Sequence, residues 1–529
     1  MPTRREFLQR GAGAAAASVL GGWWIEAAGA APPVPTGGFD AGSLQHLLST
    51  ATHDRLLVKA SFVRPLDDAP RLRVAGSTVS GRRSDRAGRF WRWDVDGLAA
   101  GRPHQLRLRD ARGRGLTEPW QIRTFPAPNS RPARLRLLIF TCAGGHDVIQ
   151  QYGIFQPARV RNRLLRRGLS FSPDAVIANG DHVYWDLEAP PTAVTMGLSP
   201  IGHREIGTFD PRNPKHNAAL LTRAAGPQIV DLYGVDCRSV PVFFLTDDHD
   251  YFENDVATKD IVTFPPAGWK LRLARATQHL YYPEFLPVPG QPSTLPWTRN
   301  GLHECFGALR YGRLLEFLMY DVRRTVTLKG QNAVFFHPRV ERWLRDRLAH
   351  SEVTHVLNMP SNPPGWTAGK WMEWYPDVLG PDRQITTAVP KPYWQSGWMA
   401  QHDRLMRAIS ARRRGVALVV GGDMHATAAG TIERTGSIDL RRNPVHVALS
   451  GTLGSKGAGF PSGLRATPPK PAGHVDLREE ITPLEENGFM LADFTTEKVT
   501  LRFFRWNSTT QSEDEIDRLQ AFQAIELGA

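Results

Sequence analysis

Groups of acidic residues, histidines, a tyrosine and a cysteine follow directly after five separate apolar runs of this sequence. Each group contains side chains that could bind a metal ion or carry a proton. The groups are Cys142, His146 and Asp147; Asp181, His182, Tyr184 and Asp186; Asp247, Asp248, His249, Asp250, Glu253, Asn254 and Asp255; Asn358; and Asp423 and His425. Their positions suggest one site assembled from distant parts of the chain.

The composition of these groups indicates a metal centre. Crowded carboxylates repel one another, and their pKa values rise strongly unless cations compensate them. Oxygen and nitrogen donors with a single sulfur indicate a hard or borderline metal, or two kinds of metal. Tetrahedral zinc fits less well, because the sequence contains neither HExxH nor a pair of CxxC motifs. We therefore predict a centre with several ions.

Each group taken alone also has an ordinary structural interpretation. A single Asp after a strand is often a turn former, and a single His is often only hydrogen-bonded. The stretch "DDHDYFEND" (247–255) could be a solvated acidic loop, and Cys142 could be a small buried hydrophobe. The agreement of all five groups favours the metal centre. Other chemistries lack their motifs, since the sequence has no GxSxG elbow and no GxxxxGK[ST] phosphate loop.

The apolar runs have the length and composition of strands buried on both faces. Segments with helical periodicity lie between several of them, which predicts an α/β fold. Ligands of open α/β sheets bind beyond the carboxyl ends of the strands, so the five groups are expected at one edge. The predicted strands cover 135–141, 174–180, 241–247, 314–321, 354–360, 416–423 and 445–451; the predicted helices cover 157–168 and 339–350; a hairpin covers 489–495 and 498–506.

The chain divides into five predicted parts. Residues 46–127 alternate apolar and polar positions between regularly spaced turn residues, which predicts an all-β sandwich of immunoglobulin or fibronectin type. A catalytic α/β domain is expected over 134–510 and a C-terminal helix over 511–529. A Pro/Gly-rich linker covers 31–45, and residues 1–30 form a separate leader.

The leader predicts export. Arg4 and Arg5 precede an Ala/Gly-rich apolar stretch and the small-residue cleavage pattern at 28–30. This arrangement resembles a twin-arginine signal peptide, so we expect recognition by the twin-arginine export machinery and a periplasmic or secreted protein. No later segment has the ~20 apolar residues of a transmembrane helix, so no membrane span is expected after cleavage.

Charge and cysteine content indicate which partners to expect and what state the thiols have. The net charge is +13, but the arginines are scattered and form no block interleaved with aromatic residues, so nucleic-acid binding is not expected. A phosphorylated small molecule or an anionic polymer fits this charge better. Cys142, Cys237 and Cys305 are too few, and odd in number, for a disulfide framework. We expect a monomer with at least one free or metal-bound thiol.

The order of these motifs resembles the PhoD-like alkaline phosphatases of the metallophosphoesterase (calcineurin-like) superfamily. The resemblance implies a four-layer α/β/β/α core, with Fe³⁺ held by Cys142, Asp181 and Tyr184 and with Ca²⁺ alongside. It implies Asp248, Asp423 and His425 as the remaining metal ligands. Another divalent pair, such as Mn²⁺ or Zn²⁺, is the alternative. The matching residues are Cys142; Gly180, Asp181, Tyr184 and Asp186; Asp247, Asp248, His249, Asn254 and Asp255; Gly422, Asp423 and His425; "DVRRT" (321–325); and "SGTLGS" (450–455).

The resemblance further implies an exported metal-dependent phosphoester hydrolase. Water activated by the cations would attack phosphorus of phosphomonoesters, phosphodiesters or both. His249 would hydrogen-bond the phosphoryl group or protonate the leaving group, and Asn358 would belong to the catalytic set. Arg323 would grip phosphate oxygens, although Arg323 and Arg324 could instead be structural ion-pair residues.

Two other functions remain open. One is a phospholipase-D-like or teichoic-acid-type phosphodiesterase, and the other is a catalytically silent envelope-binding protein on the same fold. The sequence also departs from the family pattern: "TCAGGHD" (141–147) replaces the Asp-x-His of the wider superfamily, and segments 190–240 and 365–395 diverge. The roles of His146, Asp147, His182 and Asp186 stay open.

Overall fold

The computed structural model describes most of the chain. The described residues are 38–145, 155–184, 221–251, 265–266, 268–369, 371–375, 378–379, 385–386, 391–392, 394–454, 462 and 467–529. The predicted leader lies outside this set, as do His146, Asp147, Asp186, Glu253, Asn254 and Asp255. No helix among the described residues is long and apolar enough to cross a membrane.

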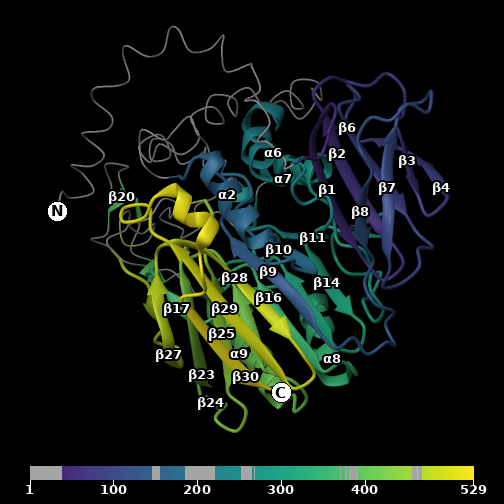
Figure 1. Cartoon of the computed structure of the whole chain (residues 1–529). Coiled ribbons are helices and arrows are strands. Elements are labelled where there is room, and N and C mark those ends of the chain that lie inside the picture. Colours follow the sequence, from purple (N-terminus) through teal and green to yellow (C-terminus); the bar gives the residue numbers. More distant parts are fainter. Residues whose placement is uncertain are drawn as a thin grey trace, which may run out of the picture.

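Residues 44–123 form two antiparallel sheets that share one hydrophobic core (Figure 1, purple). Alternation along the strands produces this core, since Leu106 and Leu108 point inward while Gln105 and Arg107 are exposed. One sheet has the order β1 (Leu44–Ala51), β2 (Leu56–Phe62), β6 (Phe90–Val95), β5 (Arg82–Arg83); the other has the order β4 (Ser77–Ser80), β3 (Arg71–Val74), β7 (Pro103–Arg109), β8 (Trp120–Arg123).

A six-stranded sheet combines three strands from the start of the larger domain with three from the C-terminal end of the chain. Its order is β11 (Val242–Leu245), β10 (Ala175–Asn179), β9 (Leu135–Thr141), β28 (Asn487–Phe494), β29 (Lys498–Trp506), β30 (Gln523–Gly528). The first three strands are parallel, so their carboxyl ends lie at one edge. The helices α2 (Ala158–Leu169) and α6 (Gly226–Tyr233) pack on one face through a shared apolar core.

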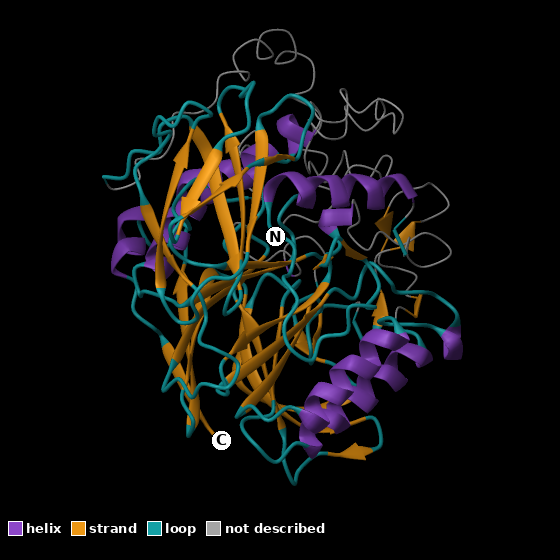
Figure 2. Cartoon of the chain, turned by 90° about the vertical axis from the view of Figure 1, so that its right-hand side faces the viewer, coloured by secondary structure: helices purple, strands orange, loops and turns teal. Residues whose placement is uncertain are grey.

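A second sheet has eight strands. Its order is β14 (Phe306–Tyr311), β15 (Leu315–Tyr320), β16 (His355–Pro360), β22 (Leu418–Gly421), β25 (Val445–Ser450), β23 (Thr427–Thr435), β24 (Ile438–Asp439), with β27 (Val475–Leu484) also paired to β23. Strands β15, β16, β22 and β25 are parallel. The helices α8 (Pro338–His350) and α9 (Ser396–Ala411) share a core with one face, and a further core joins the other face to the six-stranded sheet. Figure 2 shows the strands inside and these helices outside.

One further α-helix and several short elements make up the rest of the described chain. They are η2 (His249–Tyr251), α7 (Gly268–Tyr281), β12 (Thr298–Arg299), β13 (Leu302–His303), η3 (Gly330–Asn332), β17 (Trp366–Thr367), β18 (Trp374–Tyr375), β19 (Val378–Leu379), β20 (Ile385–Thr386), β21 (Lys391–Pro392), β26 (Lys470–Pro471) and η5 (Glu513–Arg518).

The prediction of a C-terminal helix over 511–529 is wrong. A capping box at Ser512 begins only the short 3-10 helix η5, and the chain then continues into strand β30. This strand pairs antiparallel with β29 and turns Leu527 into the core between the two sheets. Pairing satisfies the backbone groups that β29 would otherwise leave open at the sheet edge, which outweighs a local helical preference.

The N-terminal sheets are joined to the larger domain by buried polar groups. His46 on β1 contacts the carbonyl oxygen of Tyr281 through Nε2 at 2.8 Å. Lys59 on β2 is fully buried, donates to the carbonyl oxygen of Tyr282 at 3.0 Å, and pairs with Glu284 at 2.9 Å. Because these contacts are desolvated, they depend on the protonation state of the side chains involved.

Acidification is expected to lower the free energy of unfolding, with His46 as one cause. Burial lowers the pKa of His46 from 6.5 to about 4. The unfolded chain therefore takes up a proton that the folded chain excludes, so stability is full above pH 6.5 and is lost as the pH falls toward 4. The free energy of unfolding, measured with urea across this range, should change less steeply with pH in His46→Gln. The difference in slope should reach up to about 1.4 kcal/mol per pH unit. Identical slopes would contradict this assignment.

Candidate metal centre

Strained backbone marks the strand ends that form the site. Cys142 follows β9 with φ 49°, Asp181 follows β10 with φ 53°, and Asp423 and His425 follow β22 with φ 72° and 53°. Side chains other than glycine rarely adopt positive φ, and each such residue costs about 1–3 kcal/mol. Neighbouring turns hold the geometry, since the N–H of Cys142 donates to the carbonyl oxygen of Gly180 at 3.2 Å. Such clustering is typical of functional sites.

The two Gly-Asp motifs have a steric explanation. A Cβ atom on Gly180 would lie 2.6 Å from Cβ of Asp247, and one on Gly422 would lie 2.6 Å from Oγ1 of Thr141. Any larger residue would push the strand ends apart. The glycines therefore allow the following residues, Asp181 and Asp423, to lie in one cluster.

Seven buried residues bring their donor atoms together in three overlapping groups. The groups are Cys142, Asp181 and His425; Asp181, Asp248 and His249; and Asp247, Asp248 and Asp423, with the donor atoms of each group within 4.8 Å of one another. Asp181 belongs to the first two groups and Asp248 to the last two. This sharing is the geometry that ligands bridging neighbouring cations require.

Tyr184 lies beside the first group. Its hydroxyl donates to Oδ2 of Asp181 at 3.2 Å and lies 3.2 Å from Nε2 of His425. Its ring also packs against that of His249 in a tilted arrangement, with 4.3 Å between the ring centroids. Cys142, Asp181, Tyr184 and His425 thus form one S, O and N donor set.

The electrostatics of the cluster call for cations. Burial, and then the Asp181 carboxylate, raise the pKa of the Cys142 thiol well above its ordinary value. Burial, and then the surrounding carboxylates, raise the pKa of Asp181 in the same way. Burial also raises the pKa of Asp247, against the opposing effect of Arg323. A thiolate and several carboxylates can coexist here only if additional positive charge is bound.

Unsatisfied donor atoms fit bound metal ions. Among the described residues, neither Oδ1 of Asp181 nor Oδ2 of Asp247 has a hydrogen-bond partner, although both side chains are fully buried. A buried carboxylate oxygen without a partner is costly unless a cation binds it. The donor chemistry and these oxygens together fit a site for more than one metal ion.

Arg323 supplies part of the compensating charge. Its side chain is fully buried, and Nε donates to Oδ1 of Asp247 at 2.5 Å. Its Nη2 lies 3.3 Å from Oδ2 of Asp423 and 3.6 Å from Oδ2 of Asp248. These contacts correspond to the ion-pair interpretation of Arg323. Its predicted contact with phosphate oxygens stays a prediction.

Trp371 was not predicted, because it lies in the segment that diverges from the family pattern. Its indole N–H donates to Oδ2 of Asp423 at 2.5 Å. Its ring also lies under the guanidinium of Arg323, with Cζ 4.3 Å from the ring centroid. Trp371 therefore orients the carboxylate of Asp423 and the guanidinium of Arg323, and only its indole type hinted at this role.

Replacing Trp371 with phenylalanine is expected to weaken metal binding about 10- to 100-fold, the usual effect of losing a hydrogen bond to a ligand. The aromatic ring stays, so Arg323 keeps its stacking partner. Trp394→Phe is the matched control, because Trp394 contacts Trp371 but its own indole N–H has no hydrogen-bond partner among the described residues. Competition with a metal indicator measures both affinities, and equal values would oppose the positioning role.

Asp250 organises two of the strand ends. Oδ1 accepts the backbone N–H groups of His182 and Val183, each at 3.0 Å, and Oδ2 accepts the N–H of Asp247 at 3.0 Å. One carboxylate thereby connects the turn after β10 to the turn after β11. The sequence contained Asp250 within an acidic stretch but gave no sign that it would bind backbone rather than metal.

Three other predicted residues, His182, His249 and Arg324, lie in different surroundings. His182 is structural: its Nε2 lies 3.0 Å from the carbonyl oxygen of Leu245, and burial lowers its pKa to about 3. His249 lies within the second group. Arg324 pairs with Glu304 at 2.6 Å, again as an ion-pair residue.

Asn358 on β16 is fully buried. Its strand neighbours Leu357 and Met359 belong to the core between the sheets, whereas Val356 belongs to the core under α8 and α9. Because side chains alternate along a strand, Asn358 lies on the helix-covered face. Its amide has no hydrogen-bond partner among the described residues. A catalytic role for Asn358 stays a prediction.

Known proteins resemble the chain in sequence and in fold. One solved structure, described as the structure of PhoD, is 14% identical with a TM-score of 0.57, covering 94% of this chain and 90% of its own. Purple acid phosphatase PPD1 from yellow lupin (Lupinus luteus) seeds is 12% identical with a TM-score of 0.54, covering 92% of this chain and 74% of its own. None of the curated proteins compared with the chain matches it. Residues 140–503 match the PhoD-like phosphatase family, and the chain therefore belongs to that family.

Proposed function

We propose that this protein is an exported, metal-dependent hydrolase of phosphomonoesters, phosphodiesters or both. Membership of the PhoD-like phosphatase family supports a metal-dependent phosphoesterase. The observation that carries the proposal is the sharing of Asp181 and Asp248 among three groups of donor atoms. A binding protein without activity would have no need to keep such a strained and charge-loaded cluster intact.

The three groups differ in chemistry, which supports two kinds of metal. Cys142, Tyr184 and His425 surround Asp181 with sulfur, phenol and imidazole donors, a set that suits Fe³⁺. The third group offers only carboxylate oxygens, which suit Ca²⁺, and a Mn²⁺ or Zn²⁺ pair is the alternative. Asp181 and Asp248 would then each contact two ions.

The side chains of the site would divide the work of hydrolysis. Bound cations would lower the pKa of a water molecule and offset the charge on the phosphoryl oxygens. His249 lies within the central group, where its imidazole can donate a proton to the leaving oxygen. Arg323 holds Asp247, Asp248 and Asp423 in place through its guanidinium. Burial of the whole group strengthens each of these interactions.

Metal content measured together with activity tests the proposal. Purified protein should contain bound metal and should hydrolyse para-nitrophenyl phosphate or bis(para-nitrophenyl) phosphate. Cys142→Ser should lower the iron content, and Tyr184→Phe should remove a visible phenolate-to-iron absorption band. A metal-free protein inert toward both esters would overturn the proposal and favour a silent binding protein.

The ratio of the two activities separates the enzyme alternatives. A phosphodiesterase of phospholipase-D-like or teichoic-acid type should prefer the bis-ester, and the excess positive charge of the chain favours an anionic polymer or headgroup. An alkaline phosphatase should prefer the monoester.

The proposal extends to architecture and location. We place the two N-terminal sheets, with their common core, as an immunoglobulin- or fibronectin-like sandwich. The three cores of the larger domain support an α/β/β/α order, from α2 and α6 through both sheets to α8 and α9. Residues 1–30 would direct a monomer through the twin-arginine pathway to the periplasm or medium, which cell fractionation of an Arg4→Lys, Arg5→Lys variant would test.

A further inference from the structure

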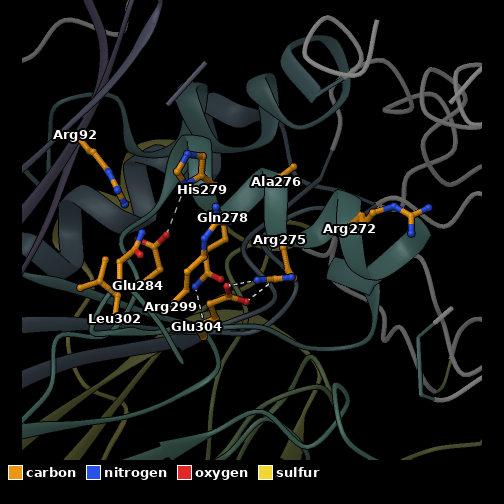
Figure 3. A pocket seen from close by; sticks show the side chains of 11 residues that line it. Arg92, Arg272, Arg275, Ala276, Gln278, His279, Glu284, Arg299, Leu302 and Glu304 are labelled. Carbon is orange, nitrogen blue, oxygen red and sulfur yellow. Dashed lines mark hydrogen bonds and ion pairs between the residues drawn. The ribbon is translucent and has the colours of Figure 1, made fainter. Parts of the chain in front are cut away.

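A pocket lies between the N-terminal sheets and the larger domain, and it shares no residue with the metal centre. Its volume is about 370 Å³. Arg92 on β6 lines one side, Arg275 and His279 on α7 line another, and Arg299 on β12 lines a third (Figure 3). The pocket is thus assembled from three segments and both parts of the molecule. Its volume is in the range of small-molecule sites.

The acidic residues of the pocket are already neutralised. Glu304 accepts hydrogen bonds from Arg275 at 2.7 Å and from Arg324 at 2.6 Å. Glu284 pairs with the fully buried Lys59 at 2.9 Å. Each carboxylate therefore has at least one cation of its own, and neither is left to balance a further positive charge.

Arg92 and Arg299 remain without a carboxylate. Within the part of the chain that the structure describes, neither guanidinium forms an ion pair, yet both line the same pocket. Figure 3 shows the guanidinium of Arg92 directed toward Glu284 and His279, whereas that of Arg272 points away from them. The surplus positive charge is thus concentrated near His279.

The pKa of His279 reflects the positive charge around it. Burial, and then the charges of Lys59, Arg92 and Arg299, lower the pKa of its imidazole to about 4, against the opposing effect of Glu284. At neutral pH His279 is therefore an uncharged ring that can donate one hydrogen bond. Because Lys59 is paired with Glu284, Arg92 and Arg299 supply the surplus positive charge near this imidazole, which makes the pocket attractive to an anion.

We propose that this pocket binds a small anion that carries phosphate, at a site separate from the metal centre. Arg92 and Arg299 would bind the phosphoryl oxygens through their planar guanidinium groups, and His279 would add a hydrogen bond. The phosphate group could be free inorganic phosphate or part of a linked pair of phosphates. This inference does not depend on the proposed hydrolysis.

Calorimetric titration of the full chain with inorganic phosphate, and separately with methylenediphosphonate, tests the proposal. Arg92→Gln combined with Arg299→Gln should weaken binding at one site by at least about tenfold, since two charge-assisted contacts are lost. Ester hydrolysis should stay unchanged. Tighter binding of methylenediphosphonate would identify linked phosphates as the ligand, and equal binding would identify a single phosphate group.

Three further variants separate binding at this site from other effects. Asp423→Asn, a change at the metal centre, should leave phosphate binding in the pocket intact. This result would distinguish binding in the pocket from binding at the metal centre. Arg71→Gln combined with Arg73→Gln removes two exposed arginines of β3, and it should leave binding unchanged. Arg92→Lys combined with Arg299→Lys keeps the charge and should bind with intermediate affinity. Wild-type binding in the Arg92/Arg299 glutamine variant, or equal loss in both glutamine pairs, would overturn the proposal.

Discussion

Asp181→Asn is expected to remove most of the bound metal and to lower phosphoester hydrolysis at least about 100-fold. Losing a partner that only supports a ligand costs 10- to 100-fold, so the loss of a ligand shared by two groups sets a higher minimum. Elemental analysis and kcat/KM on para-nitrophenyl phosphate measure the two effects. Full metal content in the variant would exclude Asp181 as a bridging ligand.

The same substitution is expected to stabilise the metal-free protein. Asparagine has the size of aspartate, tolerates the positive φ at this position and carries no charge into a buried cluster. Because Asp181 is buried among other carboxylates, removal of its charge is expected to relieve about 1–3 kcal/mol. Thermal unfolding should therefore move upward without metal and downward with metal.

Asp94→Asn is the control for this reversal. Asp94 pairs with Arg55 at 2.7 Å on a partly exposed surface of the N-terminal sheets, far from any group of metal-binding donors in the sequence. Its replacement should change the unfolding temperature of the metal-free and the metal-bound protein equally. If Asp181→Asn moved the unfolding temperature of both forms in the same direction, this result would contradict the role of Asp181 as a metal ligand that destabilises the metal-free protein.

Arg323→Met is expected to destabilise the metal-free protein by about 3–5 kcal/mol, the usual effect of removing one partner from a buried ion pair. Arg323 is fully buried and contacts three carboxylates, and Asp247 would lose its ion pair with this guanidinium. Bound metal ions would compensate part of this charge. The destabilisation should therefore be smaller when metal is present.

Two further variants provide comparisons for the destabilisation expected in Arg323→Met. Arg323→Lys keeps the charge but loses the planar fork that reaches several carboxylates, so its destabilisation should be intermediate. Arg55→Met removes a partly exposed ion pair and should cost at most about 1 kcal/mol. Chemical unfolding with and without metal measures all three, and a loss in Arg323→Met no larger than in Arg55→Met would refute a structural charge role.

Local sequence predicted the strands of the larger domain well. The runs at 135–141, 174–180 and 445–451 correspond to β9, β10 and β25 almost residue for residue. Strands buried on both faces are apolar throughout, so composition alone marks them. The Gly-Asp turns that follow them are equally local, because only glycine permits the close approach of Gly180 to Asp247.

The C-terminal segment shows where local reasoning fails. Residues 512–527 have the charge and apolar spacing of a short helix, yet strand β30 forms because β29 offers an unpaired edge. That edge exists only after the six-stranded sheet has assembled. No window of the sequence contains this information.

The sequence by itself determined which strand ends carry donor residues, and so predicted Cys142, Asp181, Asp248, Asp423 and His425 as one cluster. Only the tertiary structure decided which groups support them, namely Trp371 on Asp423, Asp250 on two turns, and Arg323 among three carboxylates. The physical reason is range. Strand composition and turn strain act between neighbouring residues, whereas a buried charge is balanced by whichever groups the fold brings into contact with it, and such contacts leave no periodic trace along the chain.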